Sequence, residues 1–404
     1  MRVKVREELV SQAVVVVVVT NKPQETNFLF VCLVLSGLLF FSSSSLFAEV
    51  LPEDRADLLY HGYDGGGVEV TGPSVLVRKK FNEKVSAKAN YYVDNITSAS
   101  IDVVTTASPY TEKRVENSVA IDFLNKNTLM SLAYTSSDES DFDATTVSLN
   151  LSQTMFGDLT TVGMGYSQGD NTISRNGDAN FEEEAKTRNY RLSLSQVINK
   201  DFIMVFAFEA ITDEGFLNNP YRSVRYLDAT VPIGYSYQPE IYPNTRTSTA
   251  LAVRGRYYLP YRAALHAGYR FFNDTWDITA HTFEFGYTIP YKKDWILDFS
   301  YRNYSQSNAD FYSDLFQVAD EFIFLARDKE LSTFKSQTLG LGVSYEFSKN
   351  GAGFIKRGSL NMNIDLIMFD YDDFRDLRVT TTPGEEPLYS FDATVLRLYL
   401  SIWF

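Results

Sequence analysis

The 404-residue sequence contains a single cysteine, Cys32, which lies in an apolar segment near the N-terminus. If that segment is removed from the mature chain, no thiol remains, which excludes disulfide bonds, thiolate metal sites and haem attached through cysteine. Histidine is also rare. His61, His266 and His281 are far apart and lack the spacing of a metal site. The sequence therefore predicts neither a metal nor a cofactor.

Long hydrophobic runs and excess positive charge are absent as well. After residue 48 no run of 18 apolar residues occurs, so no transmembrane helix is expected there. Lys and Arg number 37 against 51 Asp and Glu, which gives a net charge of −14. A nucleic-acid surface needs clustered cations, so nucleic acid is not an expected partner. What the chain has in abundance is Tyr (26) and Phe (30), which are favoured in strands and in the aromatic girdles of membrane barrels.

The N-terminal segment is expected to be a secretory signal peptide. An apolar run at Phe28–Phe41 is followed by small residues and by a cleavage site after Ala48. The valine run Val14–Val19 has no place in an ordinary signal, so the start site is interpreted as set too far upstream. A membrane anchor is the alternative, but this run is shorter than the roughly 20 residues of a spanning helix. The domain prediction is a signal peptide at 1–48 and one β-barrel at 49–404.

Apolar and polar residues alternate repeatedly after residue 48. In Val85–Asp94 (VSAKANYYVD) every second residue from Val85 is apolar, and this period of two predicts a strand with one buried face. Comparable stretches begin at Asn189, Thr249, Ala263, Ala280, Ile296, Thr338, Ser359 and Ala393.

Short polar links alternate with long, variable links between these stretches. Bacterial barrels place short turns in the periplasm and long loops outside. Counting strands through this alternation, with Ala56–Tyr63 as the first, predicts an all-β, transmembrane, antiparallel up-and-down barrel of about 16 strands, with 14 to 18 acceptable. The long links are expected at about 97–113, 170–185, 210–246, 305–331 and 371–388.

The last strand carries the most specific signal. Its alternate residues are apolar, and the terminal residue is aromatic: Leu396, Leu398, Leu400, Ile402 and Phe404. The insertion machinery of the outer membrane recognises such a strand. We therefore expect the outer membrane of a Gram-negative bacterium as the location, with outer-membrane lipids and the barrel assembly machinery as partners. A soluble array of β-sandwiches is the alternative.

Two segments, RADLLYHGYDGGGVEVTGPSVLVRKKF (Arg55–Phe81) and NYYVDNITSASIDVVTTASPYTEKR (Asn90–Arg114), carry a family resemblance. In them the sequence resembles a family of uncharacterised bacterial outer-membrane proteins, domain of unknown function 3570. The resemblance implies an outer-membrane barrel. It also implies an alternative function, that of a scaffold or sleeve for a small periplasmic lipoprotein or a flavin-carrying protein in extracytoplasmic electron transfer. No residue in these segments binds flavin by itself.

If the apolar face of each strand meets lipid, the other face carries charge into the lumen. Charged groups at membrane depth need water or each other, so either a water-filled channel or an interior plugged by ion pairs follows. Sixteen strands favour the channel, because eight strands already fill themselves with side chains. Mixed signs predict no ion preference. The predicted pore-lining residues are Lys88, Asp122, Arg191, Glu209, Arg254, Arg256, His266, Arg270, Glu284, Asp298, Arg302, Asp365 and Arg397.

One motif points to an enzyme. Gly165–Gly169 (GYSQG) matches G-x-S-x-G, the nucleophile elbow of α/β-hydrolases, which needs its serine on a sharp strand-to-helix turn. Here the segment continues an alternating strand, so the sequence predicts no enzyme and no catalytic residue. An outer-membrane hydrolase at Ser167 is kept as an alternative, which unchanged esterase activity in Ser167→Ala would remove.

The link at 97–113 differs from the other long links because its centre, Ile101–Ala107, is apolar except for Asp102. An apolar loop outside a membrane gains nothing from burial, so we expect it to fold into the lumen as a constriction. Deleting Ser98–Ser108 should raise single-channel conductance in planar bilayers, and an unchanged conductance would contradict the expectation.

Overall fold

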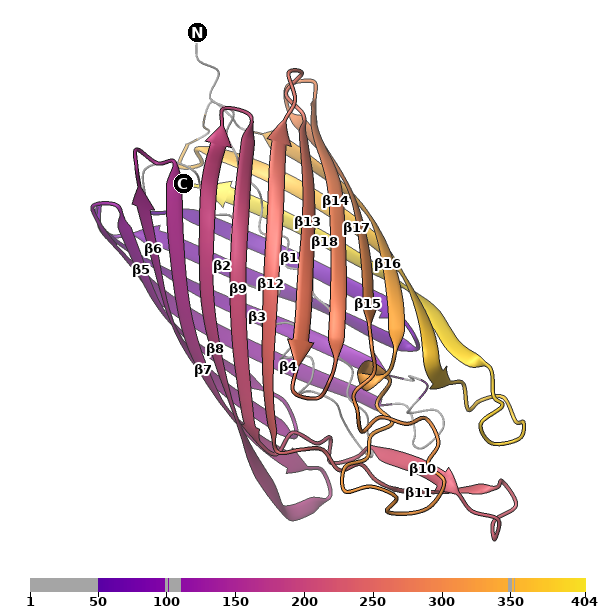
Figure 1. The fold of residues 1–404 in the computed structure, drawn as a ribbon. Coiled ribbons are helices and arrows are strands. Elements are labelled where there is room, and N and C mark those ends of the chain that lie inside the picture. The colour runs from indigo at the N-terminus through magenta and orange to yellow at the C-terminus, as the bar shows by residue number, and fades with distance from the viewer. Residues whose placement is uncertain (1–49, 99–100, 102–109, 348–350, 352) are drawn as a thin grey trace.

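The computed structural model describes residues 50–98, 101, 110–347, 351 and 353–404. Sixteen strands close into one antiparallel barrel, in which neighbours in sequence pair with one another and the first strand pairs with the last (Figure 1). The predicted fold class and strand number are confirmed, including the first strand over Ala56–Tyr63. The predicted signal peptide and most of the predicted constriction lie outside the described residues.

The wall is built from β1 (Arg55–Gly65), β2 (Val68–Lys80), β3 (Val85–Ser98), β4 (Tyr110–Asn125), β5 (Thr128–Asp138), β6 (Phe142–Met155), β7 (Thr160–Arg175), β8 (Asp178–Asn199), β9 (Phe202–Gly215), β12 (Thr245–Tyr258), β13 (Ala264–Asp274), β14 (Thr279–Tyr291), β15 (Trp295–Gln306), β16 (Phe334–Phe347), β17 (Arg357–Arg375) and β18 (Leu388–Trp403). Outside the wall lie the hairpin β10 (Ser223–Leu227) and β11 (Tyr235–Pro239) and the 3₁₀ turn η1 (Lys329–Leu331). The described residues include no helix long and apolar enough to span a membrane.

The two rims of the barrel differ in the length of their connections. The rim that holds the C-terminus has tight turns, such as Lys126-Asn127 between β4 and β5, where Lys126 takes a positive φ of 57° (Figure 1). Positive φ is what a two-residue hairpin requires. The opposite rim carries the long connections 216–244, 307–333 and 376–387. This is the predicted alternation, and it identifies the first as the inner rim and the second as the outer rim.

One predicted long link is wrong. Residues 170–185 continue β7 and β8, which meet in a tight turn at Asn176-Gly177, with a φ of 87° at the glycine. This hairpin extends beyond the apolar part of the wall, so its outward positions, among them Asp170 and Glu184, meet water. Without an apolar outward face the alternation of apolar and polar residues disappears from the sequence, although the backbone pairing continues.

The two faces of the wall differ in character along every strand. On β6, Leu149 is 54% exposed on the outward face, while its neighbour Ser148 is 6% exposed on the inward face. The outward face carries a band of exposed apolar side chains, as expected where a barrel meets lipid. The inward face is mostly polar.

The terminal strand closes the barrel. Leu400 of β18 pairs with Leu58 of β1 on one side and with Leu360 of β17 on the other. The apolar residues of the predicted insertion signal share the outward face with these two partners. Their recognition by assembly machinery stays a prediction.

Adjacent residues on β6 allow the assignment of faces to be tested. Leu149→Arg should lower the free energy of unfolding by about 2–4 kcal/mol, because it places a cation against lipid. Ser148→Arg, which points into the lumen, should lower it much less. Urea unfolding in phospholipid vesicles measures both, and equal losses would contradict the assignment.

Candidate functional site in the lumen and its outer cap

All thirteen predicted pore-lining residues lie on wall strands, at positions that alternate with the exposed apolar side chains. The structure brings nine of them together on β8 to β15, while Lys88 and Asp122 lie on β3 and β4 and Asp365 pairs with Arg397 across β17 and β18. That these residues line a conducting pore stays a prediction. The nine are Arg191, Glu209, Arg254, Arg256, His266, Arg270, Glu284, Asp298 and Arg302.

We call the cationic members of this group, Arg191, Arg254, Arg256, Arg270 and Arg302, the arginine wall. Three of its ion pairs are long: Arg270 Nη2 donates a 3.5 Å hydrogen bond to Glu209 Oε2, and Arg254 Nε lies 3.6 Å from Glu284 Oε2. Arg302 Nε is 3.9 Å from the other oxygen of Glu284. Charge-assisted hydrogen bonds are typically about 2.7–2.9 Å long, so the Arg270–Glu209 hydrogen bond is a long one, and Arg254 and Arg302 attract Glu284 from beyond hydrogen-bonding distance.

Inward-facing glycines keep large side chains close to the wall. A Cβ atom on Gly286 would lie 2.0 Å from His266 Nε2, and one on Gly165 would lie 2.8 Å from Asn150 Oδ1 and 3.4 Å from Arg191 Nε. His266 and Arg191 therefore spread sideways over neighbouring glycines. Because these side chains lie along the wall, they occupy less of the lumen than side chains that extend toward the barrel axis.

A second part of the lumen wall is uncharged, and it did not emerge from the sequence. From Leu129 to Ile173, on β5 to β7, the inward positions hold no charged residue and are mostly Ser, Thr, Gly and Asn. We call this the hydroxyl panel. Segments such as TTVGMGYSQG, in which small residues alternate with apolar ones, mark this panel in the sequence. A search for charged inward-facing residues does not find it.

Ser167 belongs to the hydroxyl panel. It pairs with Ser148 on β6 and Asn189 on β8, in the middle of the continuous strand β7. The segment that follows turns directly into β8, so the sharp strand-to-helix turn of a hydrolase does not form here. The geometry gives the hydrolase alternative no support.

The histidines stand apart from one another. His61 is buried on β1, stacked on Tyr92 and with Nε2 2.7 Å from Asp94 Oδ1. The hydroxyl of Tyr269 lies 2.8 Å from His281 Nδ1. Among the described residues no group of three or more His, Cys, Asp or Glu side chains could hold a metal ion.

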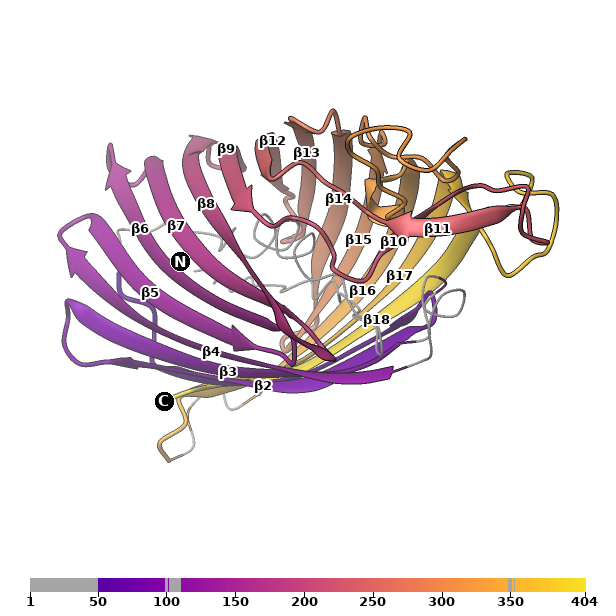
Figure 2. The ribbon, with the colours of Figure 1, turned by 90° about the horizontal axis from the view of Figure 1, so that it is seen from below.

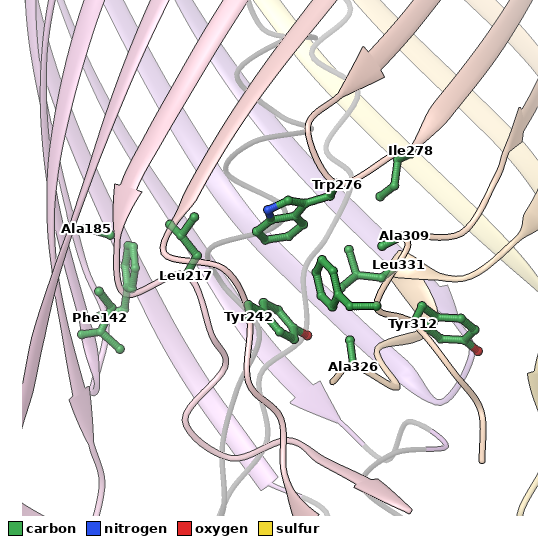
Figure 3. Packing of buried hydrophobic residues seen from close by; sticks show 12 residues of the cluster. Phe142, Ala185, Leu217, Tyr242, Trp276, Ile278, Ala309, Tyr312, Ala326 and Leu331 are labelled. Atoms are coloured by element: carbon green, nitrogen blue, oxygen red, sulfur yellow. The ribbon is translucent and has the colours of Figure 1, made fainter. Parts of the chain in front are cut away.

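The long outer connections pack together into a structure that we call the outer cap, made of residues 216–244, 307–333 and 376–387. Part of it shares a buried apolar cluster with the outer strand ends, in which Leu217 and Tyr242 meet Trp276, Ala309 and Leu331 (Figure 3). The ring of Tyr242 packs edge-on against Trp276 with centroids 5.6 Å apart. The outer connections are therefore folded onto the rim.

A buried ionic cluster ties the three parts of the cap to one another. Arg225 of β10 is fully buried and donates to both carboxylate oxygens of Glu386, at 2.5 and 3.0 Å, and also to Asp314. Arg327 contacts the same Asp314 at 2.9 Å. Removing one partner of such a buried pair leaves an uncompensated charge, so the three connections depend on each other. Sequence patterns could not reveal this cluster, because its members are far apart in polar segments.

One described residue of the predicted constriction contacts the inner side of the outer rim. Ile101 is buried against Tyr371, Phe374 and Tyr389, at the outer ends of β17 and β18. Tyr371 and Tyr389 occupy inward positions on their strands. The rest of the apolar centre lies outside the described residues, so the constriction itself stays a prediction.

Comparison with known proteins gives a family. A family model described as protein of unknown function, DUF3570, matches residues 100–356. No curated protein sequence matches the chain. Among solved structures, a bacterial polysaccharide outer membrane secretin aligns with a TM-score of 0.47 at 8% identity, over 87% of this chain and 99% of that one. OpdK of Pseudomonas aeruginosa with vanillate gives 0.42 at 8% identity over 88% and 100%, and OprD of the same organism gives 0.39 at 11% over 88% and 95%. The likeness is one of barrel architecture and leaves the solute open.

The outer cap contains a carboxyl group with an unusual pKa. Complete burial raises the pKa of Glu240 to about 7, with nearby Asp328 acting in the same direction. Arg222, the hydroxyl of Tyr242 and the backbone N–H of Arg327 oppose the shift, the last at 2.7 Å from Glu240 Oε1. Arg225 has the reverse effect on Glu386 and contributes to holding its pKa below the usual value. Glu240 is therefore a carboxyl of the cap whose protonation changes near neutral pH.

The cap should loosen as the pH rises from about 5 to about 7. A carboxyl whose folded pKa is raised stabilises the folded form while it is protonated, and that contribution is lost as the pH rises toward the folded pKa. Amide hydrogen exchange in 216–244 and 307–333, corrected for intrinsic rates, should reveal more frequent opening at pH 7.5 than at pH 5.5. Glu240→Gln should flatten this dependence, and an identical dependence in both proteins would refute it.

Proposed function

The chain belongs to the DUF3570 family of proteins of unknown function, and we propose that it is an outer-membrane channel for small polar solutes in a Gram-negative bacterium. The observation that carries the proposal is the inward face of the wall, which combines the hydroxyl panel with the arginine wall. Such a polar and charged interior is better suited to hold water and dissolved solutes than to form a packed apolar core.

The exposure of the charged groups supports an interior accessible to water. Arg254 and Glu284 are each 33% exposed although both point into the barrel. Small inward-facing side chains such as Ser148 fill little of the lumen on their side of the wall. Barrels of eight strands are filled by their own side chains, whereas barrels of sixteen to eighteen strands leave an aqueous channel.

The outer cap lies across part of the outer mouth. Figure 2, seen from the outer rim, shows β10, β11 and the connection after β15 at one side of the mouth, by the ends of β15 to β18. Its ionic cluster holds these connections as one unit. In a channel such a cap narrows the entrance and limits the size of the solutes that enter.

Planar-bilayer recording on refolded protein tests the proposal. Stepwise conductance is expected from protein whose folded state is verified by heat-modifiable gel mobility. Ser148→Trp should lower the unit conductance because it adds an indole to the lumen, whereas Leu149→Trp, which faces lipid, should leave it unchanged. Folded protein that never conducts would refute the channel.

A contact surface for a periplasmic partner is the second candidate. Three phenylalanines in inner-rim turns, Phe81, Phe156 and Phe354, are 68–78% exposed. Phe156 also holds a positive φ of 56°, a conformation that is unfavourable for a bulky side chain. A photocrosslinking amino acid at position 156 should capture a periplasmic lipoprotein in intact cells, while one at Lys126 should not. Capture of lipid alone would reject this candidate.

A further inference from the structure

We infer that the arginine wall is a binding track for small organic anions that carry carboxylate groups. This inference rests on the proposed channel, because a track serves a solute that enters the lumen. It goes beyond the sequence, in which mixed charges along the strands predict no preference for either sign.

The cations of this wall are of one kind. Of lysine and arginine, only arginine occurs at inward-facing positions on the described wall strands from β8 to β15; the arginine wall supplies five and Arg246, near the outer rim, another. The guanidinium group is planar and presents a fork of N–H donors that matches a carboxylate, whereas an ammonium is a compact point charge. A wall that only needed positive charge for solubility would have no reason to exclude lysine. The chain as a whole carries a net charge of −14, so these arginines do not reflect a general excess of cations.

The same chain contains arginines with a different geometry. Arg246 donates to Asp274 with Nε at 2.8 Å and with Nη2 as well, and both side chains are almost fully buried. Arg225 in the outer cap is closed onto its carboxylates in the same way. Where an arginine has a structural role here, it forms short and buried pairs. By contrast, the pairs that Arg254, Arg270 and Arg302 form with Glu284 and Glu209 are 3.5–3.9 Å long, and the side chains of these three arginines are 27–33% exposed.

Cross-strand register arranges the wall as a ladder along the barrel axis. Arg191 and Glu209 share a row with Ala250 of β12, and Arg270 shares the next inward-facing row with Ala252. Arg254, Gly268, Glu284 and Arg302 form the third row, and Arg256 begins the fourth. Consecutive rows are two residues apart along a strand, about 7 Å. An anion that leaves one guanidinium therefore meets the next within the length of a small dicarboxylate.

The third row has the features of a binding position. Gly268 has no side chain, so Arg254 lies across it and faces Glu284. Glu284 in turn stands between Arg254 and Arg302. A carboxylate from solution can take part in the same contacts, because neither arginine is closed onto Glu284. In this arrangement Glu284 is an internal competitor for the anion.

The test compares variants of the arginine wall with a variant of a cation outside the lumen. The double variant Arg254→Gln/Arg270→Gln should reduce the permeability of chloride relative to potassium, measured from reversal potentials in a salt gradient. It should also weaken binding of succinate to refolded protein, measured by titration calorimetry, on the order of tenfold for each guanidinium removed. Lys126→Gln, in an inner-rim turn outside the lumen, should change neither, and neutral succinamide should not bind.

Glu284→Gln separates binding from a structural role. It removes the competitor and should tighten succinate binding, whereas arginines that only hold the wall together would lose a partner and gain no affinity. Unchanged selectivity and unchanged succinate affinity in the double arginine variant would overturn the inference even if the channel conducts. A sealed barrel that still binds succinate through these arginines would refute the channel and leave the anion track standing.

Discussion

The backbone of a membrane-spanning segment must satisfy its own hydrogen bonds, because hydrocarbon offers none. In this chain the requirement is met only when β1 pairs with β18 along all eleven residues from Arg55 to Gly65. Closure fixes the register of every strand, and the register fixes which alternate residues face lipid and which face the lumen. The hydroxyl panel, the arginine wall and the ends to which the cap is attached all follow from that single closed ring.

Much of this architecture could be predicted from the sequence, because apolar and polar residues alternate along a strand wherever one of its faces meets lipid. Val85–Asp94 and the terminal residues Leu396 to Phe404 are assigned to the correct faces for this reason. The prediction failed at 170–185, where the strands continue into water and the outward face becomes polar. There the strands remain paired through their backbones, but no alternation of apolar and polar side chains marks them in the sequence.

The candidate site was only partly accessible to such reasoning. Sequence placed the thirteen charged residues on one face, but it could not distinguish Arg246, closed onto Asp274, from Arg254, held at a distance from Glu284. That distinction depends on cross-strand distances, on Gly268 as an empty position and on depth in the barrel. The outer cap was missed for a related reason: Arg225 and Glu386 meet only after the barrel has brought distant loops to one rim.

The ion pair between Arg225 and Glu386 spans 161 positions of the chain. Joining such distant points carries a large loop-closure entropy unless the intervening chain is already ordered. The complete ionic cluster is therefore expected to form most readily after β17 and β18 have joined the wall, because the ordered wall then holds the distant loops together. A folding intermediate that lacks these strands leaves its outer loops untied and open to proteases, so protease resistance of the loops reports that assembly is complete.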